Sequence, residues 1–375
     1  MKKVLVPRVR FKGFSEEWKE DTIGNIANIT NGKLDANAMV KSGMYNFYTS
    51  GIDVYKIDKY SFEGEGISIA GNGVNMGYMH LVSGKYNAYQ RTYILNNIKI
   101  DRHFLFYNLW KNFWEFCQKN TREGSIPYLL YNDISDFKIF KSHSNEQQKI
   151  GKLLDQISNL ITHEEIKLNK LKQLKETLLQ KMFPEGNSKI PRIRFKGFSE
   201  EWKEEKLEDI FKVITGGEPP KNYKNSKHPV GKYKYPIYSN GQEANAIWGF
   251  SDNYSINTEA ITISSIGTIG FPVVRKMFFT PIIRLKTLLP YNKNMNINFL
   301  NLSVSQINFS FNQAGIPSMN SNQLKDNIVL ISRNFSEQQK IGDFFCKIDT
   351  LLDLYQSKLN KLRQIKEALL QKMFV

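Results

Sequence analysis

Amide and guanidinium side chains that could hydrogen-bond to base edges stand beside two predicted strands in the first half of the chain. Asn72 and Asn75 lie in the glycine-rich segment 71–77, which directly follows one predicted strand, and Gln90 and Arg91 directly precede another. Asn and Gln can bind adenine, and Arg can bind guanine, through paired hydrogen bonds. The asparagines could instead satisfy the backbone of their own turn. We interpret all four residues as candidate DNA contacts.

A basic segment in the second half offers contacts of another kind. Residues 212–234 contain six lysines and one acidic residue among tyrosines, prolines and glycines. Lysines neutralise backbone phosphates, which supply much of the affinity of proteins for nucleic acid. We expect contact with DNA at Lys221, Tyr223, Lys224 and Lys227. The alternative is an ordinary solvated loop.

Motifs of catalysis are missing from the sequence. There is no GxxxxGK[ST] loop for ATP and no Asp-Pro-Pro-Tyr or Asn-Pro-Pro-Phe segment of an amino-methyltransferase, and Glu218–Lys221 (EPPK) lacks both the amide and the aromatic residue. The five histidines show no metal-ligand spacing. Segment 71–77 is not followed by the long helix of a dinucleotide fold. We expect a non-catalytic protein without metal or cofactor, although scattered carboxylates leave a nuclease site open.

Composition bounds the partners and the compartment. The net charge of +16 and the pI of about 9.5 favour a polyanionic partner. Cys117 and Cys346 stand in apolar, helix-like settings without CxxC spacing, so we expect both thiols to be buried in a reducing cytoplasm. No apolar run reaches the length of a membrane span. We therefore predict a cytoplasmic protein that does not contact a membrane.

These candidate contacts are framed by an internal repeat. Residues 6–20 (VPRVRFKGFSEEWKE) and 190–204 (IPRIRFKGFSEEWKE) agree at 13 of 15 positions, and EQQKIG occurs at 146–151 and 337–342. The segments between these repeats diverge almost completely. Similar frames around different middles predict one scaffold with two different recognition surfaces. We expect the repeated openings to be structural, with Phe11, Phe14 and Trp18 buried against the repeated helices.

Two long helices are expected at 145–183 and 336–374, because each range of 39 residues has helical periodicity and no internal proline. Each would be about 58 Å long. Neither stripe is stable alone in water, so we predict that the helices pack on each other in antiparallel orientation. Glu164 and Tyr355 occupy matching positions within the stripes. The apolar seam is expected at Ile150, Leu153, Ile157, Leu160, Leu171, Leu174 and Leu178 of the first helix and at Ile341, Phe344, Ile348, Leu351, Leu362, Ile365 and Leu369 of the second.

The divergent middles predict α+β domains. Strands are expected at 66–70, 93–95, 260–264 and 271–274, and short helices at 103–117 and 298–309. We place domain boundaries so that 1–144 and 185–335 form two tandem globular domains. Residues 145–184 form a central spacer helix, and 336–375 form a C-terminal helix that packs on it. The predicted fold class is α+β with a pseudo-twofold internal repeat.

The whole chain resembles the specificity subunit of Type I restriction–modification systems. The resemblance rests on the duplicated PRxRFKGFSEEWK openings, on 238–241 (YSNG) with 48–51 (YTSG), on 265–270 (SIGTIG), and on the EQQKIG helices that end in LLQKMF. It implies two target-recognition domains that each read one half of a bipartite, asymmetric DNA sequence, held apart by the helices. It also implies that the helices bind two modification (methyltransferase) subunits, which carry S-adenosylmethionine, and that restriction subunits hydrolysing ATP join the assembly.

The charge and the predicted spacer also favour a protein that recognises double-stranded DNA. Two basic domains on a stiff spacer can place recognition elements in major grooves one helical turn, about 34–36 Å, apart. The alternative is a two-lobed scaffold that binds proteins or structured RNA without DNA sequence specificity, in which charge serves only solubility. Duplex DNA with two correctly spaced half-sites would distinguish them, because a scaffold is indifferent to that spacing.

Overall fold

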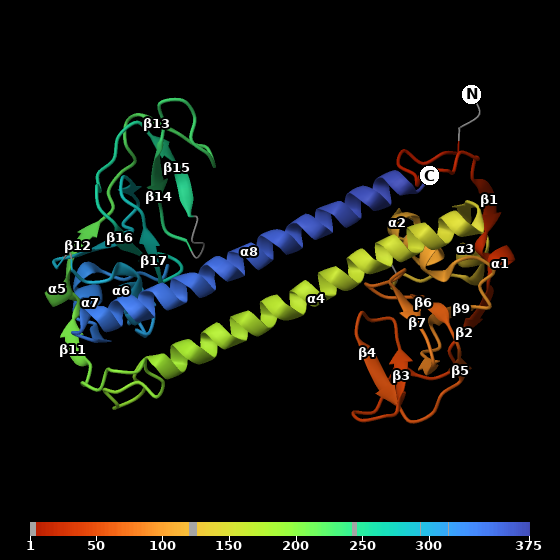
Figure 1. Ribbon diagram of the computed structural model, residues 1–375, viewed down its shortest axis with the longest axis horizontal. Coiled ribbons are helices and arrows are strands. Elements are labelled where there is room, and N and C mark those ends of the chain that lie inside the picture. The colour runs from red at the N-terminus through yellow and green to blue at the C-terminus, as the bar shows by residue number, and fades with distance from the viewer. Residues whose placement is uncertain (1–4, 120–125, 242–245, 293, 314) are drawn as a thin grey trace. The chain divides into compact units, whose positions relative to one another are not determined.

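The computed structural model describes residues 5–119, 126–241, 246–292, 294–313 and 315–375. These residues form two compact units (Figure 1). Unit 1 comprises Met1–Lys167 with Gln356–Val375, and unit 2 comprises Leu168–Tyr355. Each long helix therefore contributes one part to unit 1 and another part to unit 2.

Unit 1 contains three sheets and its share of the long helices. The central sheet has the strand order β2-β9-β6-β7, the distal sheet has the order β4-β3-β8-β5, and β1 pairs with β10. The elements in chain order are β1 (Lys19–Thr22), α1 (Ile23–Ile26), β2 (Asn28–Asn31), the 3-10 helix η1 (Ala36–Ala38), β3 (Tyr45–Tyr48), β4 (Val54–Ile57), β5 (Phe62–Glu63), β6 (Gly66–Ala70), β7 (Met79–Val82), β8 (Lys85–Ala88), β9 (Thr92–Asn96), α2 (Arg102–Lys119), α3 (Tyr131–Ser135), β10 (Lys138–Lys141) and α4 (Ser144–Met182).

Unit 2 also contains three sheets. The central sheet has the order β12-β19-β16-β17, the distal sheet has the order β13-β15-β14-β18, and β11 pairs with β20. The elements are β11 (Lys203–Lys206), α5 (Leu207–Ile210), β12 (Phe211–Thr215), β13 (Tyr223–Lys224), β14 (Tyr235–Tyr238), β15 (Ile247–Ser251), β16 (Ala260–Ser264), β17 (Gly270–Arg275), β18 (Thr280–Pro281), β19 (Lys286–Pro290), α6 (Ile297–Val304), α7 (Ser321–Lys325), β20 (Ile328–Ile331) and α8 (Phe335–Met373).

The two units share one topology. Within each unit the helices cover one side of the central sheet and the distal sheet lies on the other (Figure 1). Each distal sheet contains one parallel pair, β3 with β8 in unit 1 and β14 with β18 in unit 2. The units differ in their edge strands. β5 of unit 1 is reduced in unit 2 to the single bridge between Ile256 and Phe279, and β13 of unit 2 is reduced in unit 1 to the bridge between Val40 and Lys56.

The predicted α+β class is confirmed, and so are most of the predicted elements. The strands expected at 66–70 and 260–264 coincide with β6 and β16, and those expected at 93–95 and 271–274 lie within β9 and β17. The first short helix is longer than expected, because α2 runs to Lys119. The second is shorter, because α6 ends at Val304 instead of residue 309.

The long helices run antiparallel within each unit. In unit 1, Lys358 Nζ lies 3.0 Å from Glu164 Oε1, and Leu154 shares a core with Leu370. In unit 2, Lys175 pairs with Asp349, and Met182 shares a core with Ile341. In both units, residues with higher numbers on α8 therefore contact residues with lower numbers on α4. Each helix has 39 residues, as predicted.

The predicted seam was wrong at four leucine and isoleucine positions. Leu160, Leu174, Leu351 and Ile365 are 40%, 51%, 44% and 48% exposed. The buried or half-buried positions instead follow a repeat of about 3.5 residues, which keeps one stripe facing the partner helix along an antiparallel pair. The repeat occupies 150, 154, 157, 161, 164, 168, 171, 175, 178 and 182 of α4. Charged side chains therefore occupy seam positions 164 and 175, and several apolar side chains face outward.

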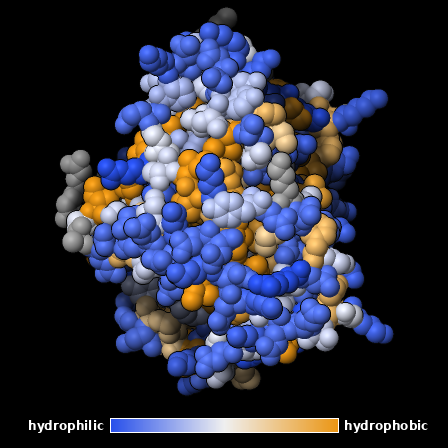
Figure 2. Space-filling model, turned by 90° about the vertical axis from the view of Figure 1, so that its left-hand side faces the viewer, coloured by the Kyte–Doolittle hydropathy of each residue, from blue (hydrophilic) through white to orange (hydrophobic). Residues whose placement is uncertain are grey.

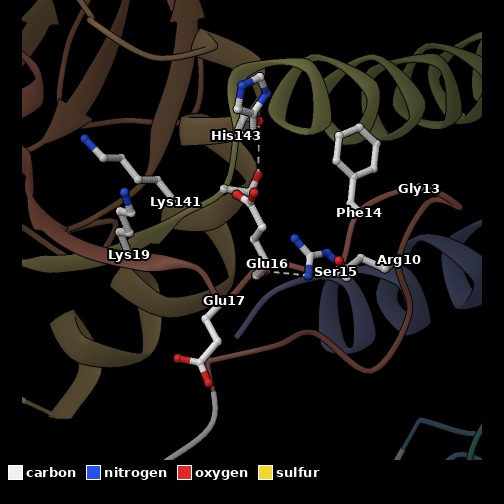
Figure 3. A pocket seen from close by; sticks show the side chains of 10 residues that line it. Arg10, Gly13, Phe14, Ser15, Glu16, Glu17, Lys19, Lys141 and His143 are labelled. Atoms are coloured by element: carbon white, nitrogen blue, oxygen red, sulfur yellow. Dashed lines mark hydrogen bonds between the residues drawn. The ribbon is translucent and has the colours of Figure 1, made fainter.

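The repeated openings hold each unit to the start of a long helix. In unit 1, Arg10 pairs with Glu146, whose side chain is fully buried, and Trp18 packs edge-on against Phe104. Trp18 is buried, as predicted, whereas Phe11 and Phe14 are only half-buried. The Lys149 ammonium covers the Phe14 ring at 5.1 Å. Figure 3 shows the hollow that Arg10 lines together with Phe14 and His143, where Arg10 Nη1 also donates to the Glu16 carbonyl at 2.6 Å.

Unit 2 repeats this frame, which explains the EQQKIG motif. Arg194 pairs with Glu337, and Gln338 Oε1 accepts from the Asn296 N–H at 3.0 Å. A Cβ on Gly342 would lie 2.3 Å from Asn296 Oδ1, and one on Gly151 of unit 1 would lie 2.5 Å from Asp101 Oδ1. The motif therefore specifies how α4 and α8 approach the short helices.

The two thiols differ in burial. Cys117 on α2 is fully buried, as predicted, and this burial raises its pKa to about 12. Cys346 on α8 is only half-buried, so the prediction for it was wrong. Throughout the part of the chain that the structure describes, every helix is too short or too polar to span a bilayer.

Candidate nucleic-acid interface

In unit 1, loops from both sheets meet at one place. We call the residues 32–34, 48–51, 71–77, 89–91 and 127–130 the unit-1 edge. The Gly71 N–H donates to the Arg91 carbonyl at 2.8 Å, the Gln90 N–H to the Leu34 carbonyl at 2.8 Å, and the Tyr89 N–H to the Tyr48 carbonyl at 2.9 Å. The loops are thus bound to one another through their backbones, which leaves side chains available for a ligand.

Gln90 and Arg91 occupy the centre of a tight turn in this edge. The Thr92 N–H donates to the Tyr89 carbonyl at 2.8 Å and closes the turn between β8 and β9. Both side chains are exposed, and neither has a hydrogen-bond partner among the described residues. Lys33, which the sequence did not single out, is exposed in the facing loop. The edge therefore presents an amide, a guanidinium and an ammonium to solvent.

The two asparagines are placed differently. Asn72 Oδ1 accepts a hydrogen bond from Ser50 Oγ, so its amide oxygen serves the contact between two loops. Asn75 is half-buried and lines an apolar hollow with Trp110 and Trp114. Both asparagines thus belong to the unit-1 edge, and Asn75 lies on the side of that edge that meets α2. The Asn72 side-chain oxygen thus binds a side chain of another loop and not the backbone of its own turn.

Unit 2 has an equivalent edge, formed by residues 215–217, 238–241, 265–269, 282–284 and 317–320. The Arg284 N–H donates to the Gly216 carbonyl at 2.9 Å, and the Ile282 N–H donates to the Tyr238 carbonyl at 2.9 Å. Asn240 Oδ1 accepts from the Ser265 N–H at 2.8 Å. These bonds join the counterparts of the loops that meet in unit 1. We call this group the unit-2 edge.

Arg284 occupies the turn position that Arg91 occupies in unit 1. The Leu285 N–H closes the turn on the Ile282 carbonyl at 3.1 Å, and the Arg284 side chain is exposed. Both central residues have positive φ, 51° at Ile283 and 60° at Arg284. A β-branched residue rarely adopts this conformation. Sequence reasoning missed Arg284, because such turns are usually signalled by Asn-Gly or Asp-Gly.

Glycines allow the loops to approach within both edges. A Cβ on Gly32 would lie 2.0 Å from the Ala88 carbonyl oxygen, and one on Gly216 would lie 2.8 Å from the Ile282 nitrogen. Any side chain at either position would therefore push the two sheets apart. The glycines fix the same geometry in units whose neighbouring side chains differ.

The predicted contacts in the basic segment of unit 2 lie on or beside β13, an edge strand of its distal sheet. Tyr223 and Lys224 form β13, which pairs with β15, and the Tyr223 ring lies 4.6 Å from the Trp248 ring. Lys221, Tyr223, Lys224 and Lys227 are all exposed. Figure 2 shows a mostly hydrophilic surface at the top of this face, where Figure 1 places β13. The segment is thus partly an edge strand that displays lysines, with the Tyr223 ring tilted at 46° against the Trp248 ring.

The chemistry available at both edges is hydrogen bonding and charge attraction. No group of three or more His, Cys, Asp or Glu among residues 5–119, 126–241, 246–292, 294–313 and 315–375 is arranged to hold a metal ion. Guanidinium, amide, ammonium and hydroxyl groups are those that proteins use against base edges and phosphates. The geometry therefore fits recognition of a nucleic acid.

Comparisons with known proteins agree with this chemistry. The model of the family described as "Type I restriction modification DNA specificity domain" matches residues 15–173 and again 199–364. A putative type I specificity subunit of Mycoplasma pneumoniae is 28% identical over 331 residues, which cover 85% of this chain and 86% of that one. The EcoDI specificity subunit of Escherichia coli is 32% identical over 158 residues, 42% of this chain, but the match spans only 35% of that subunit.

Solved structures share the fold. The crystal structure of an S subunit of a Type I restriction–modification system from M. genitalium aligns with a TM-score of 0.74 over 99% of both chains, at 19% identity. The two family matches each contain one of the loop edges and one EQQKIG segment described above. The chain thus belongs to the Type I restriction modification DNA specificity family, as a subunit that confers DNA sequence specificity.

Proposed function

We propose that the chain is a non-catalytic reader of a bipartite, asymmetric DNA target in a Type I restriction–modification enzyme. The unit-1 edge reads one half-site and the unit-2 edge reads the other. The observation that carries this proposal is that one topology and one set of loop contacts recur in both units, while the displayed side chains differ, Gln90 in one and Ile283 in the other. Equivalent scaffolds with unlike side chains suit two unlike half-sites.

Residue roles follow from exposure and chemistry. We assign Arg91 and Arg284, which are exposed on equivalent turns, to guanine edges and Gln90 to adenine. Lys221, Lys224 and Lys227 hold phosphates beside Tyr223, as proteins do when they position themselves on a duplex. Asn72 and Asn75 belong to the unit-1 edge and are its further candidates for adenine contacts. The two target-recognition domains of this proposal are 1–144 and 185–335, with 145–184 and 336–375 as the helical segments.

The outer faces of the long helices are suited to protein partners. In unit 1, Ile166 and Ile365 are each 48% exposed, and in unit 2 Leu174 and Leu354 are 51% and 63% exposed. In this proposal these exposed leucine and isoleucine side chains are covered in the assembly. We assign these faces to two modification (methyltransferase) subunits, with restriction subunits joining the same cytoplasmic assembly.

The test is sequence-specific binding by the full chain, co-expressed with its methyltransferase subunits. Mapping of modified bases in cells with and without the gene gives the target. The purified assembly should bind duplex DNA that carries both half-sites, and insertion of one or two base pairs between the half-sites should abolish binding. The chain alone should neither methylate nor cleave DNA. Equal binding of spaced, misspaced and RNA ligands would instead indicate a scaffold without sequence specificity.

A further inference from the structure

A buried lysine lies behind the unit-2 edge. Lys286 is the first residue of β19 and pairs in register with Thr215 of β12. Its residue is only 5% exposed. The ammonium donates to Thr215 Oγ1 at 3.0 Å and to Ser321 Oγ at 2.9 Å, and these hydroxyl oxygens are 3.2 Å apart. An ammonium can donate three hydrogen bonds. After these bonds, one N–H of the ammonium and one of the two hydroxyl hydrogens are left over at the end of the central sheet.

No negative charge in the described part of the chain balances this lysine. The described carboxylates form no ion pair with it, and its two partners are neutral hydroxyls. Burial lowers the pKa of Lys286, and repulsion from Arg284 lowers this pKa further. Taking an ammonium out of water without an opposite charge is costly, even when it is hydrogen-bonded. The arrangement is therefore unfavourable for the isolated unit and becomes favourable when an anion approaches.

Unit 1 shows that the fold does not need a cation here. Tyr93 occupies the same place at the start of β9, where it pairs in register with Asn31 of β2. Its hydroxyl donates to the Leu129 carbonyl at 3.0 Å, which leaves a neutral and satisfied side chain. The central sheet thus accommodates an uncharged residue at the equivalent position. The charge at Lys286 is a property of unit 2 alone.

We propose that Lys286, Thr215 and Ser321 form a socket for one backbone phosphate of the DNA that the unit-2 edge reads. This inference rests on the proposed function. A phosphate projects from the duplex and carries a full negative charge, so it can reach a recessed ammonium. Base edges lie within a groove and carry only partial charges, so they require a projecting side chain such as Arg284. The socket fixes the duplex while Arg284 reads it.

The experiment replaces Lys286 by Met, which is similar in length but uncharged, in the full chain co-purified with its methyltransferase subunits. Binding is measured from about 50 to 300 mM salt, on duplexes with the correct and with an altered second half-site. The control is Lys276→Met, which removes an exposed lysine at the other end of the central sheet, beyond β17. Thermal unfolding of each variant shows whether unit 2 remains folded.

We expect Lys286→Met to reduce the slope of log affinity against log salt by about 0.9 and to weaken binding roughly fivefold at 0.15 M salt, since one counterion is released per phosphate neutralised. Both duplexes should weaken by the same factor, and the methylated sequence should stay the same. An unchanged slope overturns the socket, and a relaxed second half-site overturns its assignment to phosphate. Failure of the wild-type assembly to discriminate sequences counts against the proposed function instead, so the two failures are distinguishable.

Discussion

Arg10 binds Glu146 through two hydrogen bonds, from Nε to Oε1 at 2.7 Å and from Nη2 to Oε2 at 2.8 Å. The bonds join the opening segment of unit 1 to the first turn of α4. Arg194 and Glu337 repeat the pair within unit 2. In both cases the carboxylate is fully buried. Two-pronged pairs of this kind are geometrically demanding, which accounts for the near-identity of the openings.

Glu146→Ala should destabilise unit 1 by about 3 kcal/mol, because it leaves the Arg10 guanidinium without its buried partner. Denaturant unfolding gives the magnitude, and hydrogen exchange read by mass spectrometry gives the location. The matched control is Glu16→Ala, since Arg10 binds the backbone carbonyl of Glu16 and not its side chain. Similar losses in both variants would show that the buried pair adds no stability.

Arg91→Ala and Arg284→Ala should each relax one position of one half-site. A good paired contact to guanine discriminates against the wrong base by about 1–3 kcal/mol. The readout is the methylated sequence in cells that carry each variant. Arg333→Ala is the control, because this exposed arginine pairs with Glu205 at the frame of unit 2. An unaltered motif in either turn variant would remove that arginine from the reading surface.

Ile283→Asn should stabilise unit 2 by roughly 0.5–1 kcal/mol, because Asn tolerates the left-handed conformation better than a β-branched residue does. Ile283 has a φ of 51° and is 47% exposed, so little apolar burial is lost. Thermal unfolding measures the gain. Gln90→Asn at the equivalent turn of unit 1 should bring none, since Gln90 is not among the residues with positive φ. Higher stability in Gln90→Asn, or lower stability in Ile283→Asn, would contradict backbone strain at Ile283.

Leu354→Glu on the outer face of α8 should weaken binding of a methyltransferase subunit roughly tenfold or more, by placing a charge in an apolar contact. Stability should change by no more than about 0.5 kcal/mol, because Leu354 is exposed. The subunit ratio of the co-purified complex, measured by native mass spectrometry, reports the loss. Val230→Glu, a similar change at an exposed site away from the long helices, should keep the full ratio.

The contact between β1 and β10 should weaken in acid. Lys141 donates to Asp21 Oδ2 at 2.5 Å, and this bond lowers the pKa of Asp21 from its ordinary value near 4 to about 2. A lowered carboxylate pKa stabilises the folded state above about pH 4, and that stability is lost as pH falls toward 2. Between pH 2 and 5, the free energy of unfolding should depend less steeply on pH in Asp21→Asn than in the wild-type chain. Glu20→Gln, at an exposed pair with Lys138, should keep the slope.

The sequence predicted the repeat, the long helices and the central strands, because each leaves a strong local pattern. It placed most of the seam and put Glu164 within the stripe, but it was wrong at four apolar positions. Leu160 and Leu174 fit the stripe by residue type, yet both are exposed, and Lys175 occupies the seam instead. In a packed antiparallel pair the seam follows a repeat near 3.5 residues. The partner of a seam residue, such as Lys358 for Glu164, lies far away in the sequence and cannot be read from the local pattern.

The candidate site was predicted in unit 1 more fully than in unit 2. Gln90 and Arg91 precede a recognisable strand, whereas Arg284 follows Ile283 in a turn without any glycine or asparagine. Only the shared hydrogen bonds of the two edges show that Arg284 and Arg91 are equivalent. Lys286 opens an apolar strand, and its burial depends on Thr215 and Ser321, which come from distant parts of the chain.

The ion pairs, tryptophans and close-packed glycines of the frame are separate from the turns that carry Arg91 and Arg284. Substitutions of the exposed side chains on those turns should therefore change the folding stability little. If the turns read the target as proposed, a few exposed side chains can change the sequence that is recognised, while the buried pairs at Glu146 and Glu337 keep the fold intact.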